Sequence, residues 1–344
     1  MAVFSDIRPI MIDRDSVLRQ LQKVGVDLGA SVTFSPLTGG VSSDIWLIES
    51  GAGKYVVKQA LPKLKVKDHW AADVKRNLAE QAYINFVRTF NPRAVPKILL
   101  SDDSVPYFIM EFLGPPLQNW KEKLLQGDGD SKKVVQAATL LAEIHNQSRG
   151  HQSLATRFDH LDGFYALRLE PYLVTAGKRS PQLAPYFSAE VQRLMTDRSV
   201  LVHGDYSPKN LLVSDSGMVL LDHEVACWAD PSFDISFLVN HLFLKLLYHH
   251  RSHHAPQFKL LPELAWHNYF AAVEAPDTDL LQRKSAKLLL MLMLARVDGK
   301  SPVEYLIVEK RNWLRNFVSK YLPLSEAEEF EFISQAFISE LDNQ

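Results

Sequence analysis

Apolar and polar residues alternate through much of the first third of the chain. This alternation predicts five short strands, at residues 31–35, 44–49, 54–59, 97–100 and 106–111. Between Asp68 and Phe90 the apolar residues instead recur at helical spacing, at Val74, Leu78, Ala82 and Phe86. We therefore expect a small β-rich lobe with one main helix packed on its sheet.

Helical spacing dominates after residue 118. It predicts helices at 134–146, 188–196, 235–247 and over most of 260–341. The longest apolar run, 288–295, is far shorter than the roughly 20 residues that cross a bilayer, so we expect a buried helix there. The predicted organisation is an N-terminal lobe (1–110), a hinge (111–116) and a C-terminal lobe (117–344), with ligands expected in the cleft between the lobes.

Composition narrows the classes of function. The chain has 344 residues, a hydrophobic share of 47% and a formal net charge of -2. It can bury a sizeable core, but it lacks the basic excess that attracts nucleic acids or acidic membranes, so we expect a small-molecule partner. Its one cysteine, Cys227, cannot form an internal disulfide, and the first residues do not resemble a secretory signal. The cytoplasm is the expected compartment.

The segment LVHGDYSPKN (201–210) carries the most specific chemistry. It places Asp205 and Asn210 in one loop, and two short apolar runs around the turn 214–217 predict a hairpin that ends at Asp222. Phosphoryl transfer needs a carboxylate that orients the acceptor hydroxyl and oxygen ligands that hold magnesium. The pattern therefore predicts a kinase active site. The alternative, a loop rich in ordinary turn residues, does not account for the hairpin and its second aspartate.

Two N-terminal features could contact nucleotide phosphates. Gly39, Gly40, Ser42 and Ser43 precede a predicted strand and could cover phosphates, although a tight turn would use the same glycines. Lys58 lies on a strand and could reach the phosphates, although a lysine at a sheet edge is the alternative.

A carboxylate is expected to hold Lys58. Glu80 is the best candidate, because it shares a helical face with Tyr83 and Ile84 that should pack inward, and Asp73 is the rival.

Acidic residues also follow Asp222. Glu224 would lie on the same side as Asp222 in extended geometry, so it could join the metal site or face the acceptor. Asp230 or Asp234 could cap the helix that begins near Ile235.

These segments together resemble the aminoglycoside phosphotransferase family, which includes choline-kinase-like and other small-molecule kinases. The resemblance is strongest in LVHGDYSPKNLLV and LLDHEVACWADPSFD, and it extends to LTGGVSSDIWLI, YVVKQA and FIMEFLG. It implies an α+β, bilobal protein-kinase-like fold, whose larger and mostly helical C-lobe carries the catalytic hairpin. ATP and Mg²⁺ are the implied cofactors.

The resemblance also implies roles for individual residues. Asp205 would be the catalytic base, Asn210 and Asp222 would bind magnesium, and Lys58, oriented by Glu80, would contact the α and β phosphates.

Further roles follow from the same resemblance. Residues 39–43 would cover the phosphates, backbone groups near Glu111 and Leu113 would bind adenine, and Asp234 would support the catalytic loop.

Two departures from the protein-kinase pattern bear on the acceptor. Gly204 stands where many protein kinases have an arginine, and only eleven residues separate Asp222 from Asp234, which leaves little room for peptide docking. We therefore expect a small hydroxylated acceptor, a metabolite or an aminoglycoside-like compound. A protein kinase and a catalytically silent nucleotide-binding regulator are the alternatives.

Acceptor contacts are sought among polar residues of the second lobe. The segments DGFYALRLEPYL and ARVDGKSPVEYLI look like a bacterial subgroup of the family. The candidates are Arg168, Glu170, Tyr172, His241, Lys245, Arg296, Asp298 and Lys300. Helix caps and buried ion pairs would explain these residues nearly as well. Acidic residues are not visibly pooled for a cationic aminoglycoside, so a role in antibiotic resistance is not favoured.

Overall fold

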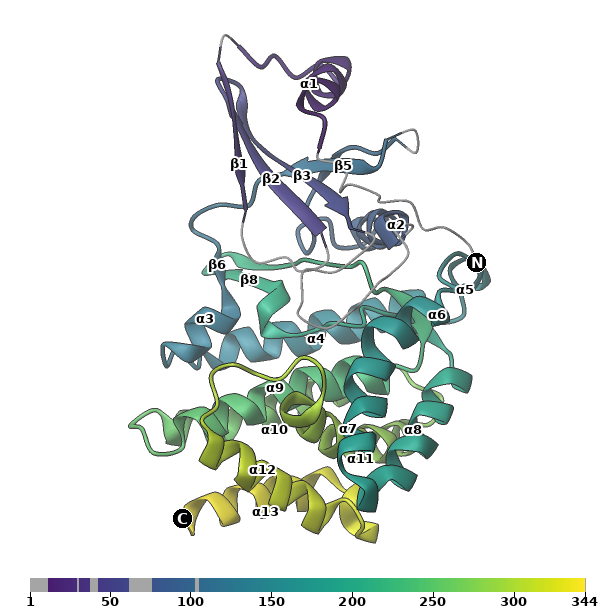
Figure 1. Cartoon of the computed structure of the whole chain (residues 1–344), viewed down its shortest axis with the longest axis vertical. Helices are drawn as coiled ribbons and strands as arrows, with labels where there is room; N and C mark the ends of the chain where they lie inside the picture. Colours follow the sequence, from purple (N-terminus) through teal and green to yellow (C-terminus); the bar gives the residue numbers. More distant parts are fainter. Residues whose placement is uncertain (1–11, 30, 38–42, 62–75, 103–104, 344) are drawn as a thin grey trace, which may run out of the picture. The chain divides into compact units, whose positions relative to one another are not determined.

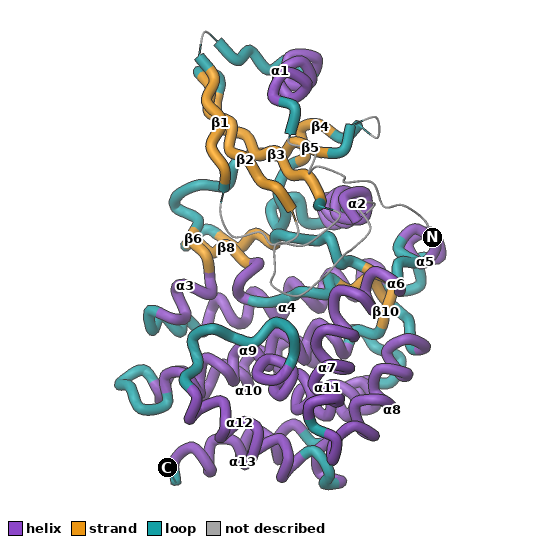
Figure 2. The backbone as a smooth tube through the Cα atoms, viewed as in Figure 1, coloured by secondary structure: helices purple, strands orange, loops and turns teal. Residues whose placement is uncertain are grey.

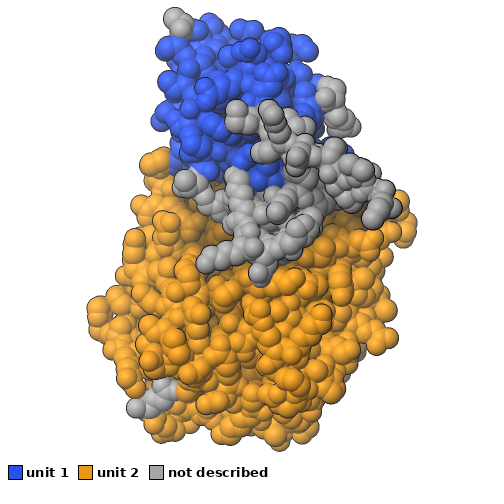
Figure 3. Space-filling model, viewed as in Figure 1, with its two compact units in different colours: residues 1–114 blue, residues 115–344 orange. Residues whose placement is uncertain are grey.

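The computed structural model of the chain describes residues 12–29, 31–37, 43–61, 76–102 and 105–343. The chain divides into two compact units, Met1–Gly114 and Pro115–Gln344 (Figure 3). The first unit contains a five-stranded sheet and two described helices, whereas helices make up most of the second unit (Figure 2). Each unit is considered by itself below.

An antiparallel sheet forms the centre of the first unit (Figure 1). Its strands follow the order β1-β2-β3-β5-β4. Their bounds are β1 (Val32–Pro36), β2 (Ser43–Ser50), β3 (Gly53–Ala60), β4 (Ile98–Leu100) and β5 (Tyr107–Glu111). Each predicted strand is present. Burial alternates along β1, whereas both faces of the central strand β3 are buried from Val56 onward.

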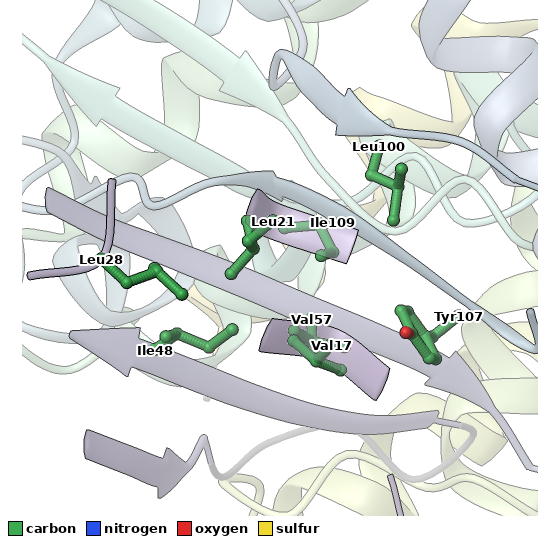
Figure 4. Close-up of a cluster of buried hydrophobic side chains, with 8 residues drawn as sticks. All are labelled: Val17, Leu21, Leu28, Ile48, Val57, Leu100, Tyr107 and Ile109. Carbon is green, nitrogen blue, oxygen red and sulfur yellow. The ribbon is translucent and has the colours of Figure 1, made fainter. Parts of the chain in front are cut away.

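The helix α1 (Arg14–Lys23) covers part of this sheet and was not predicted. Asp13 caps its first turn by accepting hydrogen bonds from two backbone N–H groups. The side chains of Val17 and Leu21 join the buried cluster that Ile48 and Ile109 contribute from the sheet (Figure 4). The first unit therefore has a second described helix in addition to the expected one.

The expected helix is α2 (Arg76–Arg88), and its buried face differs from one prediction. Leu78, expected in the inward stripe, is 46% exposed, whereas Glu80, Tyr83 and Ile84 are buried. Ala82, from the same series as Leu78, is buried, so the predicted helix is confirmed and only Leu78 lies outside its buried face. That face also carries a large aromatic ring and a branched aliphatic chain, which favour its burial. Val74 lies outside the described residues.

The second unit is mostly helical. Its α-helices are α3 (Trp120–Leu125), α4 (Ser131–Ser148), α5 (Gln152–Arg157), α6 (Leu161–Phe164), α7 (Thr175–Arg179), α8 (Ala184–Thr196), α9 (Ser232–His249), α10 (Ala255–Ala272), α11 (Thr278–Asp298), α12 (Val308–Tyr321) and α13 (Phe330–Asp342). It also has a π-helix, η1 (Tyr165–Val174), and short 3₁₀ turns η2 (Pro181–Leu183), η3 (Pro208–Asn210) and η4 (Ser325–Glu328).

The long helices α9 and α11 form the interior of this unit. They pack against each other, and the apolar run 288–295 of α11 is buried throughout, as predicted. Within the described ranges, no helix is long and apolar enough to cross a membrane.

Two small sheets in the second unit position the predicted active-site loop. β8 (Leu211–Ser214) and β9 (Gly217–Leu220) form the predicted hairpin, to which β6 (Gln118–Asn119) adds a strand. The second sheet, which was not predicted, pairs β7 (Val200–Val202) with β10 (Cys227–Ala229). Loop 203–210 thus runs from β7 to β8, and segment 221–226 runs from β9 to β10, so strand pairing holds both ends of each segment.

Candidate active site

Asp234 supports the loop 203–210 from the start of α9. Its fully buried carboxylate accepts hydrogen bonds from the backbone N–H of His203, at 2.6 Å, and of Gly204, at 2.9 Å. Gly204 has a φ of 75°, and a Cβ there would lie 2.9 Å from the carbonyl oxygen of Val225, so a larger residue would disturb the loop. Of the two capping candidates, it is Asp230 that accepts from the backbone N–H of Ser232.

The carboxylate of Asp205 has two side-chain partners. Its Oδ2 accepts a hydrogen bond from Asn210 Nδ2 at 2.8 Å and lies 3.1 Å from Arg168 Nη2. Arg168 also donates to the carbonyl oxygen of Gly204. The arginine therefore fixes both the carboxylate and the backbone that precedes it.

Arg168 was predicted only as an acceptor contact, so its contact with Asp205 was missed. The arginine lies on η1, 37 positions earlier in the chain, and local spacing gives no signal for such a pair. Burial disfavours the charged guanidinium, but its pKa is raised overall because the carboxylates of Asp205, Glu224 and Asp222 stabilise the charge. Three acidic side chains therefore lie in the electrostatic neighbourhood of one arginine.

Asp222 follows the hairpin and is joined to the loop through the backbone. The N–H of Leu221 donates to the carbonyl oxygen of Asn210 at 2.8 Å, and His203 Nε2 lies 3.0 Å from the Leu221 carbonyl oxygen. Asp222 has a φ of 65°, in the left-handed region that non-glycine residues rarely occupy. Such strain is often found at functional sites.

The extended geometry predicted between Asp222 and Glu224 is wrong. Asp222 has left-handed backbone, and the chain turns at Glu224 and Val225, where the N–H of Ala226 donates to the carbonyl oxygen of His223. Alternation of side chains therefore does not apply here. Glu224 is buried and interacts electrostatically with Arg168, and its place in a metal site stays a prediction.

The first unit contains the pair of Lys58 and Glu80. Lys58 Nζ, on β3, donates to Glu80 Oε1, on α2, at 2.8 Å, and both side chains are almost fully buried. Glu80 is the partner that the sequence favoured, and Asp73 lies outside the described residues. Removal of either partner would leave an uncompensated buried charge.

The other predicted nucleotide contacts are described only in part. Gly39, Gly40 and Ser42 lie outside the described residues, and Ser43 is buried at the start of β2. Glu111 ends β5, where its carboxylate accepts a hydrogen bond from the backbone N–H of Lys97 at 2.7 Å. Leu113 is half-buried just beyond it.

Some acceptor candidates have partners within the protein. Glu170 and Lys300 form an ion pair at 2.8 Å, and Asp298 accepts from Arg315 through both carboxylate oxygens. These contacts agree with the alternative of structural ion pairs. Tyr172, His241, Lys245 and Arg296 lie elsewhere in the same unit and are considered further below.

A comparison with protein families identifies the chain. Residues 33–249 match the model of the phosphotransferase enzyme family, APH. The chain belongs to this family. The match includes the loop 203–210, Asp222 and the pair of Lys58 and Glu80, and it confirms the resemblance found in the sequence.

Curated relatives and solved structures add to this assignment. A methylthioribose kinase of Geobacillus kaustophilus (strain HTA426) is 25% identical over 219 residues, 56% of this chain and 55% of that protein. The chain thus spans about half the length of such relatives.

Two solved structures confirm the fold. A choline kinase of Cryptosporidium parvum Iowa II has a TM-score of 0.53, with 13% identity over 96% of this chain and 100% of that one. The amicoumacin kinase hAmiN, solved with AMP-PNP, Ca²⁺ and Ami, has a TM-score of 0.50, with 15% identity over 92% and 93% of the two chains. The protein-kinase-like α+β fold predicted from the sequence is therefore correct.

Proposed function

We propose that the protein is an ATP- and magnesium-dependent phosphotransferase that moves the γ-phosphoryl group to a hydroxyl of a small molecule. The observation that carries the proposal is the 2.8 Å contact between Asp205 and Asn210 in a loop supported by Asp234. Family membership and the names of the relatives, all kinases of small molecules, support the same activity.

In this proposal, Asp205 orients the acceptor hydroxyl and receives its proton. Among the described residues, both side-chain contacts of this carboxylate use Oδ2, from Asn210 and Arg168. In this proposal, Oδ1 would receive the hydroxyl proton of the acceptor. A carboxylate held in one rotamer loses little entropy when the hydroxyl arrives, which favours a reactive geometry.

The side chains around the loop fit magnesium. Mg²⁺ in phosphoryl-transfer sites takes one or two carboxylates together with phosphate oxygens. Asp222 supplies a carboxylate, and Asn210, whose Nδ2 donates to Asp205, can supply its amide oxygen. Among the described residues no three His, Cys, Asp or Glu side chains gather as a metal site, so phosphate oxygens would complete the ligand set. The ion would neutralise phosphate charge.

The first unit would supply the remaining nucleotide contacts. Lys58 would contact the α and β phosphates, because its pairing with Glu80 fixes the ammonium group at the end of β3. Residues 39–43 would cover the phosphates, and backbone groups near Glu111 and Leu113 would bind adenine. These roles rest on the family resemblance.

The alternatives are less well supported. A protein substrate would need a docking segment, and the eleven residues between Asp222 and Asp234 leave little room for one. A silent regulator would be expected to have lost part of the site, whereas Asp205, Asn210 and Lys58 are all present.

The test is magnesium-dependent ATP consumption with a panel of aminoglycosides, choline, ethanolamine, sugars and hydroxy acids. The Asp205→Ala variant should lower acceptor-dependent turnover at least about 100-fold, because the group that takes the hydroxyl proton is gone, while ATP affinity stays close to that of the unmodified protein. Asp215→Ala, in the exposed turn of the same hairpin, is the matched control. Near-normal turnover of Asp205→Ala would contradict the base assignment, and silence with every acceptor would contradict the activity.

A further inference from the structure

Two buried basic side chains and one half-buried arginine lie in the second unit, and the roles proposed above do not use them. We call His241 and Lys245, on α9, and Arg296, on α11, the basic cluster. Lys245 is 0% exposed. Among the residues that the structure describes, Lys245 Nζ, His241 Nε2 and Arg296 Nε have no hydrogen-bond partner. Arg296 Nη1 donates to the carbonyl oxygen of Ser301 and so has a partner within the chain. Burial of Lys245 Nζ and His241 Nε2 without hydrogen-bond partners costs free energy, so folding alone does not account for these two groups.

The charges around the basic cluster are also unbalanced. Burial lowers the pKa of Lys245 far below its usual value, and Lys121 and Arg296 lower it further. Burial likewise lowers the pKa of His241, with contributions from Arg296, Lys245, Lys121 and Lys209. The carboxylate that acts on Lys245 is Glu304, which is itself paired with Lys121. The local field therefore favours a further negative charge.

Aromatic rings connect the basic cluster with the catalytic loop. The ring of Tyr172 lies 5.5 Å from the Arg296 guanidinium carbon and 5.9 Å from that of Arg168, the residue that contacts Asp205. Arg296 Nη1 also donates to the Tyr172 hydroxyl at 3.1 Å. The basic cluster is therefore continuous with the surroundings of the reacting carboxylate.

The helix α9 gives the approximate scale. Figure 1 shows α9 beside α11. On α9, His241 follows Asp234 by seven residues and Lys245 follows His241 by four, so the three residues share one face of the helix. At about 1.5 Å per residue, His241 lies about 10 Å along the axis from the residue that supports the catalytic loop. The first turn of α9 therefore contacts the catalytic loop, and later turns of the same helix carry two members of the basic cluster.

We infer that the acceptor is a hydroxylated acid, whose carboxylate or phosphate group is bound by Lys245, Arg296 and His241 while its hydroxyl meets Asp205. This inference rests on the proposed function and specifies its substrate class. An ammonium and a guanidinium are the side chains that bind such anions best, and withdrawal from water strengthens the attraction. Arg296 and Lys121, which act on Lys245 electrostatically, would repel an aminoglycoside or choline.

The first arm of the test compares acceptors that differ only in charge. Ribose is set against ribose 5-phosphate and ribonate, and glycerol against glycerate and glycerol 3-phosphate, with kcat/KM measured from ATP consumption. At least one acid should exceed its neutral counterpart about tenfold or more, because a charged hydrogen bond contributes that much. The carboxylates and phosphates in the panel separate the two kinds of anion. A preference for neutral or cationic acceptors, with turnover still dependent on Asp205, would overturn the inference and leave the proposed function intact.

The second arm removes one cation. Lys245→Met removes the amino group and should abolish the preference for the acid, because kcat/KM for the acid should fall about tenfold or more. Lys259→Met is the matched control, since Lys259 lies on α10 and pairs with Asp342 at the surface. An acid preference that survives Lys245→Met would overturn the assignment of this lysine to the anion.

The third arm measures binding without turnover. Calorimetric titration of the ADP-bound protein with ribose 5-phosphate, in buffers of different ionisation enthalpy, should show proton uptake, because a bound anion raises the pKa values of Lys245 and His241. Lys245→Met should reduce that uptake and weaken binding about tenfold or more. If no acceptor is phosphorylated, the proposed function is wrong. Proton uptake that depends on Lys245 would even then support an anion site. Absence of binding by every acid would overturn that site.

Discussion

Among the residues that the structure describes, two lysines are buried, one in each unit, and their surroundings contrast. Lys58 is 3% exposed and its ammonium group contacts the carboxylate of Glu80 at 2.8 Å. Lys245 is 0% exposed, has neighbours of its own charge, and lies with its Nζ 3.9 Å from the ring centroid of Tyr305.

The difference shows how the same side chain can serve stability or recognition. The two charges of a buried ion pair compensate each other within the chain. Removal of one of the two side chains is therefore expected to destabilise the fold. A buried lysine whose neighbours are cations and an aromatic ring contributes less to folding, because cation–π attraction only partly offsets desolvation. Its presence is better explained by a negative charge that arrives from outside.

The largest expected effect concerns the paired lysine. Glu80→Gln leaves the Lys58 ammonium group without its compensating charge, and we expect the free energy of unfolding to fall by about 3 kcal/mol. Urea denaturation measures this change. Glu49→Gln, which removes the partner of Lys54 at the surface, is the control and should cost less than about 1 kcal/mol. Similar losses in the two variants would break the comparison between buried and exposed pairs.

A smaller effect of opposite sign is expected for the other lysine. Lys245→Met should leave the free energy of unfolding unchanged or raise it by up to about 2 kcal/mol near pH 7, because no charge is then buried. Folding lowers the pKa of Lys245 below its unfolded value of about 10.5. Between these two pKa values the unfolded state binds more protons than the folded state. The free energy of unfolding of the unmodified protein therefore rises with pH in this range. The gain in Lys245→Met should therefore shrink as the pH approaches 10.5.

Denaturation curves at several pH values measure this prediction. A loss of more than about 1 kcal/mol at pH 7 would show that the contact with Tyr305 outweighs desolvation, and the two lysines would then be alike.

The smallest effect concerns the geometry of the catalytic loop. Arg168→Lys keeps the positive charge but removes the planar fork that contacts both Asp205 and the Gly204 carbonyl oxygen. We expect kcat to fall about tenfold, with little change in the KM for the acceptor or in the melting temperature. Arg157→Lys, at the exposed end of α5, is the control. A fall in melting temperature that accounts for the lost activity would assign Arg168 to folding.

The sequence predicted those features that depend on local patterns. The hairpin of β8 and β9 followed from two apolar runs around a turn that ends in Gly217, and the pairing of Lys58 with Glu80 followed from the helical face that also carries Tyr83. The support of the loop by Asp234 came from the family resemblance, and the hydrogen bonds agree with it.

The remaining features depend on contacts between residues that lie far apart in the sequence, or on unusual backbone conformations. The π-helix η1 brings Arg168 to Asp205, and no periodicity reports such a contact. The conformation of Glu224 was missed because Asp222 adopts positive φ, which is uncommon for a non-glycine residue. The exposure of Leu78 shows that helical spacing alone does not define the limits of a buried face.

The helix α9 also has an evolutionary consequence. Its first turn, through Asp234, is tied to the loop 203–210, whereas His241 and Lys245 lie two to three turns further along the same rod. Substitutions at the later positions can alter which compounds are accepted while the hydrogen bonds at the first turn persist. Related enzymes can therefore differ in their acceptors while they keep the same phosphoryl-transfer chemistry.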